Sequence, residues 1–165
     1  MIYFDNAATT KLDPLVLNAI LPYFDAIYGN PSAAYSLGRS AKHAVLRAKE
    51  TIANCLTCSE NEIIFTASGS ESNNIAIQNL LAAQDRSRNI IITSKMEHPS
   101  VLNTIEQYEK KGYVIKYIPI LKNGQIDIAC LENELNENVA LVSVMMVNNE
   151  VGSIQDIKRI TCMAH

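Results

Sequence analysis

The chain has 165 residues, of which 48% are hydrophobic, so it is long enough to form one compact domain with a buried core. Its 14 basic and 17 acidic side chains give a net charge of −3, and this balance argues against nucleic-acid binding. The start of the chain lacks the features of a secretory signal, and no apolar stretch is long enough to span a membrane. We therefore expect a cytoplasmic protein without nucleic-acid or membrane partners.

The first third of the chain is predicted to be mostly helical. Asp13-Pro14 opens a helix, because aspartate caps a helix and proline suits its first position. Gly29-Asn30-Pro31-Ser32 then ends this helix after about Tyr28. A second helix is predicted over about 36–56, where apolar residues recur at helical spacing.

From residue 62 onward, short apolar strands are predicted to alternate with helices. The predicted strands are 62–66, 89–93, 113–119 and 140–147, and the predicted helices are 71–84, 99–111, 127–136 and 156–164. Strands that are apolar throughout are typical of a parallel sheet covered on both faces. The pattern predicts an α/β domain with a mostly parallel sheet and helices on both faces. Because the chain stops in a helix, where such a sheet would normally continue, we expect it to be truncated.

Cysteine spacing raises the question of a metal site. Cys55 and Cys58 have the spacing of half a zinc site, but no second pair or Cys/His cluster completes it, and Cys130 and Cys162 are isolated. Cysteines of a cytoplasmic chain are expected to be reduced. We therefore predict no metal site, and interpret the pair as small residues that end a helix.

Polar loops follow three of the predicted strands, and in an open parallel sheet ligands bind at the carboxyl ends of the strands. The first loop, 66–74, is rich in small residues and leads into a helix. The free N–H groups and positive dipole end of that helix favour phosphate, to which the Ser70 hydroxyl can add a hydrogen bond. The alternative is an ordinary capped turn, since Ser, Gly and Asn are common there.

The other two loops carry a histidine and two asparagines. His98 stands at the predicted N-cap of a helix, where an imidazole can stack on a planar ring or move protons near neutral pH, or serve only as a cap. Asn148 and Asn149 follow a buried strand, where their amides can bind a ligand's polar edge or simply form a turn. The agreement of the three loops on one edge of one sheet predicts a single ligand pocket.

Several segments together resemble the signatures of the cysteine desulfurase family, in that family's order and over essentially the whole chain. They are Tyr3–Thr10, Gly29–Ser32, Phe65–Asn74, Glu97-His98, Asn148–Gly152 and Gln155–Ile157. The resemblance implies the N-terminal part of the large domain of a fold-type-I transferase that depends on pyridoxal 5'-phosphate (PLP). Residues 1–30 would be an N-terminal segment and helix, and 31–165 an incomplete large domain.

The resemblance also implies an activity and roles for particular residues. Relatives are homodimers that convert L-cysteine to L-alanine and pass the sulfur, as an enzyme persulfide, toward iron–sulfur clusters, thiolated cofactors or tRNA through a sulfur-acceptor protein. Gly69 and Ser70 fall where the family binds the PLP phosphate, with Ser70 in the place of a usual threonine. His98 falls where a catalytic histidine stacks on the pyridine ring, and Asn149 where an asparagine contacts the ring hydroxyl.

Four functional groups of the family have no counterpart in these 165 residues. They are the lysine of a Ser-x-His-Lys segment that binds PLP covalently, the carboxylate on the pyridinium nitrogen, the sulfur-accepting cysteine and the arginine that binds the substrate carboxylate. The chain alone is therefore expected to be inactive. A related selenocysteine lyase, an aminotransferase-like enzyme and a non-catalytic fragment stay open as alternatives.

Overall fold

A computed structural model describes residues 2–85 and 87–165 of the chain. These residues form two compact units, the first ending at Phe65 and the second beginning at Thr66. The expected division into 1–30 and 31–165 concerns the domains of the whole protein and stays a prediction. Within the described residues, no helix combines the length and the apolar composition needed to cross a membrane.

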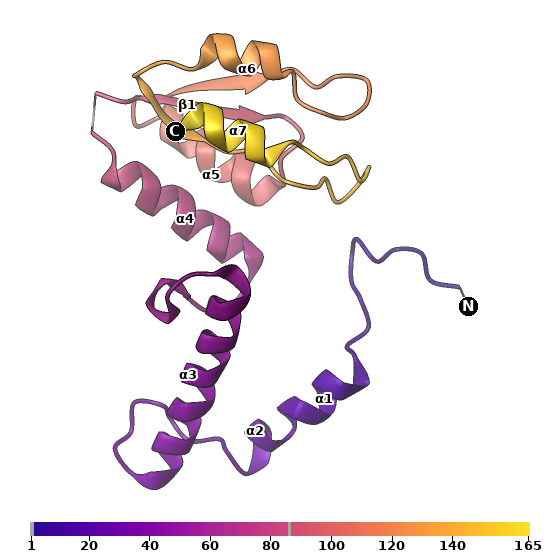
Figure 1. The fold of residues 1–165 in the computed structure, drawn as a ribbon, viewed down its shortest axis with the longest axis vertical. Helices are drawn as coiled ribbons and strands as arrows, with labels where there is room; N and C mark the ends of the chain where they lie inside the picture. The colour runs from indigo at the N-terminus through magenta and orange to yellow at the C-terminus, as the bar shows by residue number, and fades with distance from the viewer. Residues whose placement is uncertain (1, 86) are drawn as a thin grey trace. The chain divides into compact units, whose positions relative to one another are not determined.

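The N-terminal unit is helical. It contains α1 (Pro14–Ile20), α2 (Pro22–Asp25), α3 (Ser36–Leu56) and the short 3-10 helix η1 (Glu60–Glu62), drawn in indigo to purple in Figure 1. Asp13 caps α1 as predicted, because its Oδ1 accepts a hydrogen bond of 2.7 Å from the Leu15 backbone N–H. The bounds of α3 confirm the helix predicted over 36–56.

The single helix predicted from Asp13 to about Tyr28 is wrong. α1 ends at Ile20, and a separate short helix, α2, runs from Pro22 to Asp25. Proline has no backbone N–H, and its ring clashes with the carbonyl group four residues earlier. Pro22 therefore interrupts a helix that the apolar pattern would otherwise continue, and the break falls before Gly29.

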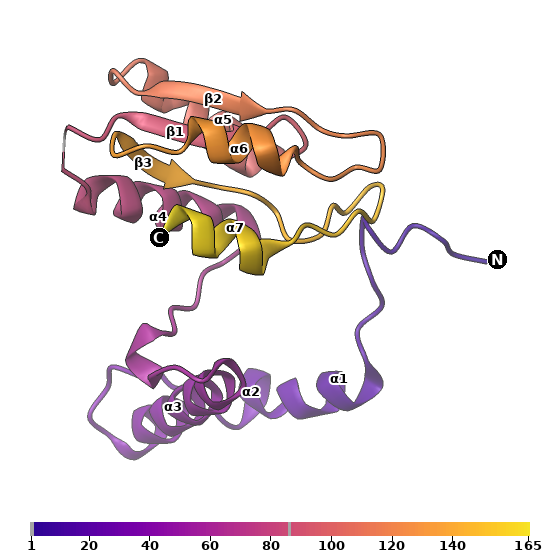
Figure 2. The same ribbon diagram turned by 45° about the horizontal axis from the view of Figure 1, so that its top comes forward.

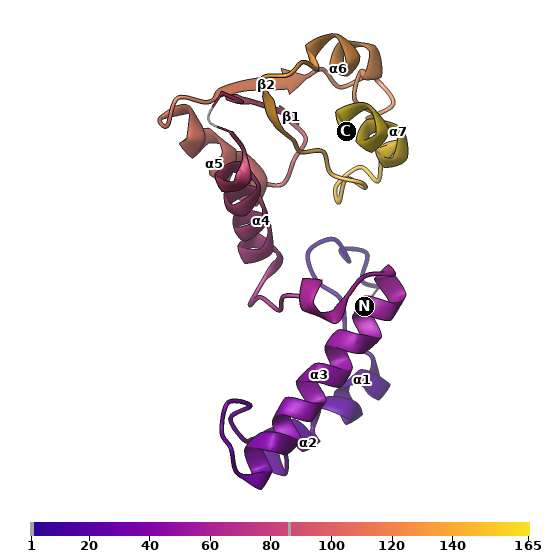
Figure 3. The same ribbon diagram turned by 60° about the vertical axis from the view of Figure 1, so that its left-hand side comes forward.

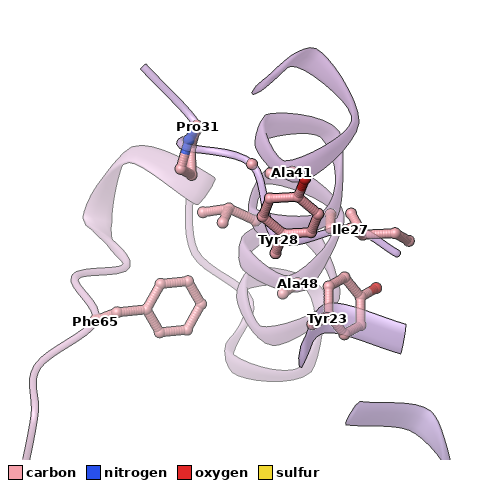
Figure 4. Close-up of a pocket in the computed structure, with 10 residues that line it drawn as sticks. Tyr23, Ile27, Tyr28, Pro31, Ala41, Ala48 and Phe65 are labelled. Carbon is pink, nitrogen blue, oxygen red and sulfur yellow. The ribbon is translucent and has the colours of Figure 1, made fainter. Parts of the chain in front are cut away.

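An apolar pocket of about 490 Å³ lies in the N-terminal unit beside α3. The rings of Tyr23, Tyr28 and Phe65 surround it (Figure 4). Apart from the two tyrosine hydroxyls, its lining side chains are apolar. It therefore lacks the polar groups that would orient a phosphate or an amino acid.

The C-terminal unit is an α/β structure built on three parallel strands. Its elements are α4 (Gly69–Ala83), β1 (Ile90–Ser94), α5 (Pro99–Glu109), β2 (Val114–Ile118), α6 (Ile128–Glu134), β3 (Val139–Val142) and α7 (Ile157–Ala164). The strand order is β2-β1-β3, with β1 in the centre (Figure 2). The structure confirms the predicted parallel sheet.

Helices cover both faces of this sheet, as predicted. Ile91 of β1 is fully buried against α4 and α5, where it packs with Ile77, Leu81 and Ile105. Its neighbour Ile92 points to the opposite face, into the core cluster that includes residues of α6 and α7. Figure 3 shows the two helix pairs on opposite sides of the strands. The alternation explains why successive residues such as Ile91 and Ile92 are both apolar in a strand covered on both faces.

The strand predicted over 62–66 is wrong. Residues 63–66 follow η1 as an irregular segment, and the side chains of Ile64 and Phe65 are 68% and 52% exposed. An apolar, β-rich run forms a strand only where a neighbouring strand completes its hydrogen bonds. Among the described residues, no strand pairs with this one.

The strand predicted over 140–147 is shorter than expected. β3 ends at Val142, and one further N–H, that of Ser143, donates to Ile92 O at 2.9 Å. The Met145 N–H donates to the side chain of Glu97 and not to a strand. The apolar run therefore continues past the strand into a loop.

Candidate functional site

The three predicted site loops lie at the carboxyl edge of the parallel sheet. β1 ends at Ser94 and leads into α5, and β3 ends at Val142 and leads through a long loop into α7. α4 runs back along the sheet before β1 begins, so its first turn lies at the same edge (Figure 2). Ligands of open α/β sheets bind at this edge.

The first turn of α4 offers free backbone donors. Ser68 is the N-cap, and its Oγ accepts from Glu71 N at 3.2 Å, while Glu71 Oε2 accepts from Ala67 N at 2.6 Å. Within the described part of the chain, the Gly69 and Ser70 N–H groups have no acceptor. The helix begins two residues earlier than predicted because Ser68, and not a later residue, provides the cap.

Gly69 and Ser70 fit a phosphate group. A Cβ built on Gly69 would meet nothing within 4 Å, so the space beside this residue is open. Both residues are exposed, and the positive end of the α4 dipole adds to the attraction for an anion. The Ser70 hydroxyl supplies a further donor beside them.

His98 caps α5 through one ring nitrogen. Its Nδ1 accepts from the Ser100 backbone N–H at 3.1 Å and lies 2.8 Å from Ser100 Oγ. A ring nitrogen that accepts a backbone N–H carries no proton, so a neutral ring in this geometry has its proton on Nε2. The imidazole is exposed, which leaves its face and Nε2 available to a ligand.

Two series of side-chain hydrogen bonds link the α4 turn to the His98 loop and α5. Asn73 Nδ2 donates to Ser100 Oγ at 2.8 Å, and Ser100 Oγ contacts His98. Asn74 Nδ2 donates to Ser70 O, while its Oδ1 accepts from Thr104 Oγ1 of α5, both at 2.8 Å. These side chains hold the starts of α4 and α5 together, so the residues predicted to bind a phosphate and a ring lie close to one another.

The third loop is fixed by Asn148. This residue is 5% exposed, and its Oδ1 accepts from the backbone N–H groups of Glu150 and Val151, each at 2.9 Å. Its Nδ2 donates to Met96 O in the His98 loop at 3.1 Å. Asn149 is exposed, and its Nδ2 donates to Glu150 Oε1 at 3.0 Å. Asn148 therefore ties the loop down, and Asn149 is the asparagine left accessible.

Glu97 is a buried carboxylate beside His98 whose role the sequence did not indicate. It is 6% exposed, and its Oε1 accepts from Ser94 Oγ at 2.9 Å and from Met145 N at 3.0 Å. Burial raises the pKa of its carboxyl, and the two hydrogen bonds offset part of that rise. A charged residue just after an apolar strand is the sequence signal that could have singled it out.

Gln155 is a second buried polar residue that had no predicted role. Its Oε1 accepts from Ile126 N at 2.9 Å, and its Nε2 donates to Gly124 O at 2.8 Å. It thus joins the loop after β3 to the connection between β2 and α6. Buried polar groups are generally hydrogen-bonded, and both ends of the Gln155 amide have a partner within the protein.

None of the four cysteines belongs to the three loops in the sequence. All four are free, and Cys55 and Cys162 are exposed. Over residues 2–85 and 87–165, no group of three or more His, Cys, Asp and Glu side chains could hold a metal ion.

Comparison with known proteins gives a family for this arrangement. The family model for aminotransferase class V matches residues 2–165. A cysteine desulfurase of Nostoc sp. is 45% identical over 160 residues, which cover 97% of this chain and 40% of that protein. A cysteine desulfurase IscS of Clostridium botulinum is 40% identical over 159 residues, which cover 96% of this chain and 40% of that protein.

Solved structures agree. A NifS-like protein superposes with a TM-score of 0.95 at 36% identity, covering 99% of this chain and 45% of that one. A structure described as SspA in complex with cysteine superposes with a TM-score of 0.91 at 36% identity, covering 98% of this chain and 47% of that one. The chain thus spans about 40% of the length of the curated relatives that it matches.

The fold and the sheet-edge loops define part of a PLP-dependent transferase of the α/β class. The chain belongs to the aminotransferase class-V family, and the relatives that it matches within that family are cysteine desulfurases.

Proposed function

We propose that the whole protein is a cysteine desulfurase, which converts L-cysteine to L-alanine and retains the sulfur as an enzyme persulfide. The names of the relatives and the cysteine complex of one structural neighbour support this substrate. In the net reaction the Cβ–S bond of cysteine breaks and an S–S bond to an enzyme thiolate forms. The thiol proton of the substrate ends on a carbon of alanine.

The residues of this chain that would hold PLP come from the three loops. Gly69 and Ser70 would bind the phosphate through their N–H groups and the serine hydroxyl, His98 would lie on the ring face, and Asn149 would contact the ring hydroxyl. The observation that carries this assignment is the set of hydrogen bonds that joins the α4 turn, the His98 loop and the Asn148 loop at one sheet edge. Bound PLP supplies an electron sink that makes the substrate Cα–H acidic.

Among the residues of the three loops, we assign proton transfer to His98. Because Nδ1 is engaged by Ser100, proton exchange with a ligand is restricted to Nε2. The Ser100 contacts also fix the orientation of the ring, so its face is presented in one position. A histidine held in one tautomer by its neighbours is typical of acid–base catalysis.

The partners follow from the same proposal. The whole protein would act as a homodimer in the cytoplasm and deliver sulfur to an acceptor protein for iron–sulfur cluster, thio-cofactor or tRNA synthesis. The IscS names of several relatives support the iron–sulfur role.

Equilibrium dialysis of the 165-residue chain against PLP tests the cofactor assignment. We expect saturable binding that inorganic phosphate displaces, because the phosphate group contributes a large share of the contacts. Binding of PLP that phosphate does not displace would contradict the role given to Gly69 and Ser70. The absence of saturable binding would contradict the proposed function of these loops.

A further inference from the structure

Glu97 is unusual among the residues near the site because it is a charged group that is almost fully buried. Both of its hydrogen bonds end on the same oxygen, Oε1, which accepts from Ser94 Oγ and from Met145 N. Among the described residues, Oε2 has no hydrogen-bond partner. Burying a carboxylate at this position costs desolvation free energy, so we expect Glu97 to have a role that offsets this cost.

The bond to Met145 joins two loops of the candidate site. Glu97 precedes His98 in the loop after β1, and Met145 precedes Asn149 in the loop after β3. A second tie, from Asn148 Nδ2 to Met96 O, runs between the same loops at 3.1 Å. The two ties fix the position of one loop against the other in the residues just before His98 and Asn149.

We propose that Glu97 is a positioning residue, whose Oε1 reaches Met145 N and thereby sets where the loop of Asn149 lies relative to His98. This inference rests on the proposed function, in that it assigns Glu97 an effect on contacts with the ring of PLP. It assigns no effect on the phosphate contacts of Gly69 and Ser70, which belong to the separate turn of α4.

The positioning role of Glu97 depends on the length of its side chain and not on its negative charge. A neutral amide oxygen at the position of Oε1 can accept both hydrogen bonds, and the group that replaces Oε2 loses no partner. An aspartate keeps the charge but is shorter by one C–C bond, about 1.5 Å, so its oxygens no longer reach Met145 N. Glu97→Gln and Glu97→Asp therefore separate the two explanations.

The experiment compares these two variants with the wild-type 165-residue chain. Glu106→Asp serves as the matched control, since it shortens an exposed glutamate on the helix that follows Glu97. Two quantities are measured for each protein. One is the hydrogen-exchange rate of the Met145 backbone N–H, and the other is the pair of dissociation constants for PLP and for inorganic phosphate.

Glu97→Asp is expected to speed the exchange of Met145 N–H and to weaken PLP binding, each by about tenfold, because one hydrogen bond to the loop is lost. Its affinity for inorganic phosphate stays within about twofold of wild type, because the α4 turn is untouched. Glu97→Gln is expected to restore both quantities to within about threefold of wild type. Glu106→Asp changes neither.

The opposite pattern, in which Glu97→Gln is defective and Glu97→Asp is not, overturns the inference, as does equal weakening of PLP and phosphate. If Glu97→Asp does not fold, Ser94→Ala replaces it, and we expect changes of about threefold in the same directions, because Oε1 loses one of its two partners. If the wild-type chain does not bind PLP, the proposed function fails. The exchange rate of Met145 alone then decides whether Glu97 fixes the loop.

Discussion

A few polar side chains determine how the site loops are joined. Asn73 and Asn74 connect the start of α4 to α5, and Asn148 and Glu97 connect the loop after β1 to the loop after β3. Each of these hydrogen bonds contributes modestly, about 0.5–1.5 kcal/mol, but a buried partner left unpaired is costly. The residues proposed to contact PLP are exposed, and the residues that hydrogen-bond the loops together are buried or half-buried.

Ser70 tests the phosphate assignment at the level of one hydroxyl. Ser70→Ala removes that donor but keeps the Gly69 and Ser70 N–H groups and the helix dipole. We expect the dissociation constant for PLP to rise by about tenfold or more, as for the loss of one hydrogen bond to a charged group. Equilibrium dialysis measures it, with Ser87→Ala, in the segment before β1, as the control. An unchanged affinity in Ser70→Ala would argue against a contact with the phosphate.

Glu97 predicts a pH dependence of stability. Because burial raises the pKa of its carboxyl in the folded state, Glu97 stabilises the fold most below the ordinary pKa of a glutamate. That contribution is lost as the pH rises through the folded-state pKa. We expect the free energy of unfolding of wild type minus that of Glu97→Gln to fall with rising pH across this window. Urea titrations from about pH 4 to 8 measure the difference, and an increase with pH would contradict the expectation.

At the scale of elements, two glycines lie in the first turns of helices but in different surroundings. A Cβ on Gly69, at the start of α4, would meet nothing within 4 Å, whereas a Cβ on Gly38, in the first turn of α3, would collide with the carbonyl oxygens of Asn30 and Ala33. Gly38 is also buried, while Gly69 is exposed. Gly69 is therefore compatible with a larger residue. Gly38 allows the carbonyl groups of Asn30 and Ala33 to pack closely against α3.

Alanine substitutions should separate these two cases. Gly69→Ala is expected to raise the free energy of unfolding by about 0.4–1 kcal/mol, because the unfolded chain loses freedom and no contact is strained. Gly38→Ala is expected to lower it by about 1–3 kcal/mol through overpacking. Hydrogen exchange resolved to α4 and α3 measures each effect in its own helix. Equal effects of both substitutions would contradict this account.

The elements differ in how well the sequence predicts them. The apolar strands at β1 and β2 and the capped helix α7 were recognisable because local pattern and tertiary structure agree. The strand predicted over 62–66 was not formed, since a strand depends on a partner that its own residues do not specify. The sequence also predicted an end of β3 that is too late, at residue 147. The hydrogen bond from Met145 N to Glu97 joins residues far apart in the chain, and a local pattern does not reveal it.

The candidate site shows the same limit. Short-range signals predicted a phosphate loop before α4, a cap at His98 and a polar turn at Asn149, and whether these residues bind a ligand stays a prediction. Glu97 and Gln155 had no predicted role, because their significance lies in burial and in partners from distant loops. Residues that contact a ligand belong to local motifs, whereas residues that position them depend on the tertiary structure.

At the scale of the whole molecule, the proposed activity needs groups that these 165 residues do not contain. The Ser-x-His-Lys segment of the family is absent from them, and the chain spans about 40% of the curated relatives. We expect the purified 165-residue chain to release no sulfide from L-cysteine above a blank with free PLP. Sulfide above that blank would mean that another lysine and another thiol of this chain can replace the family's groups.

The central claim is that the α4 turn, His98 and Asn149 form one pocket for PLP. The most direct test is a titration of the ¹⁵N-labelled chain with PLP, followed by the chemical shifts of its backbone amides. We predict saturable shifts concentrated at Gly69, Ser70, His98 and Asn149, with little change elsewhere. Shifts centred on the apolar pocket beside α3, or no saturable shifts at all, would contradict the account.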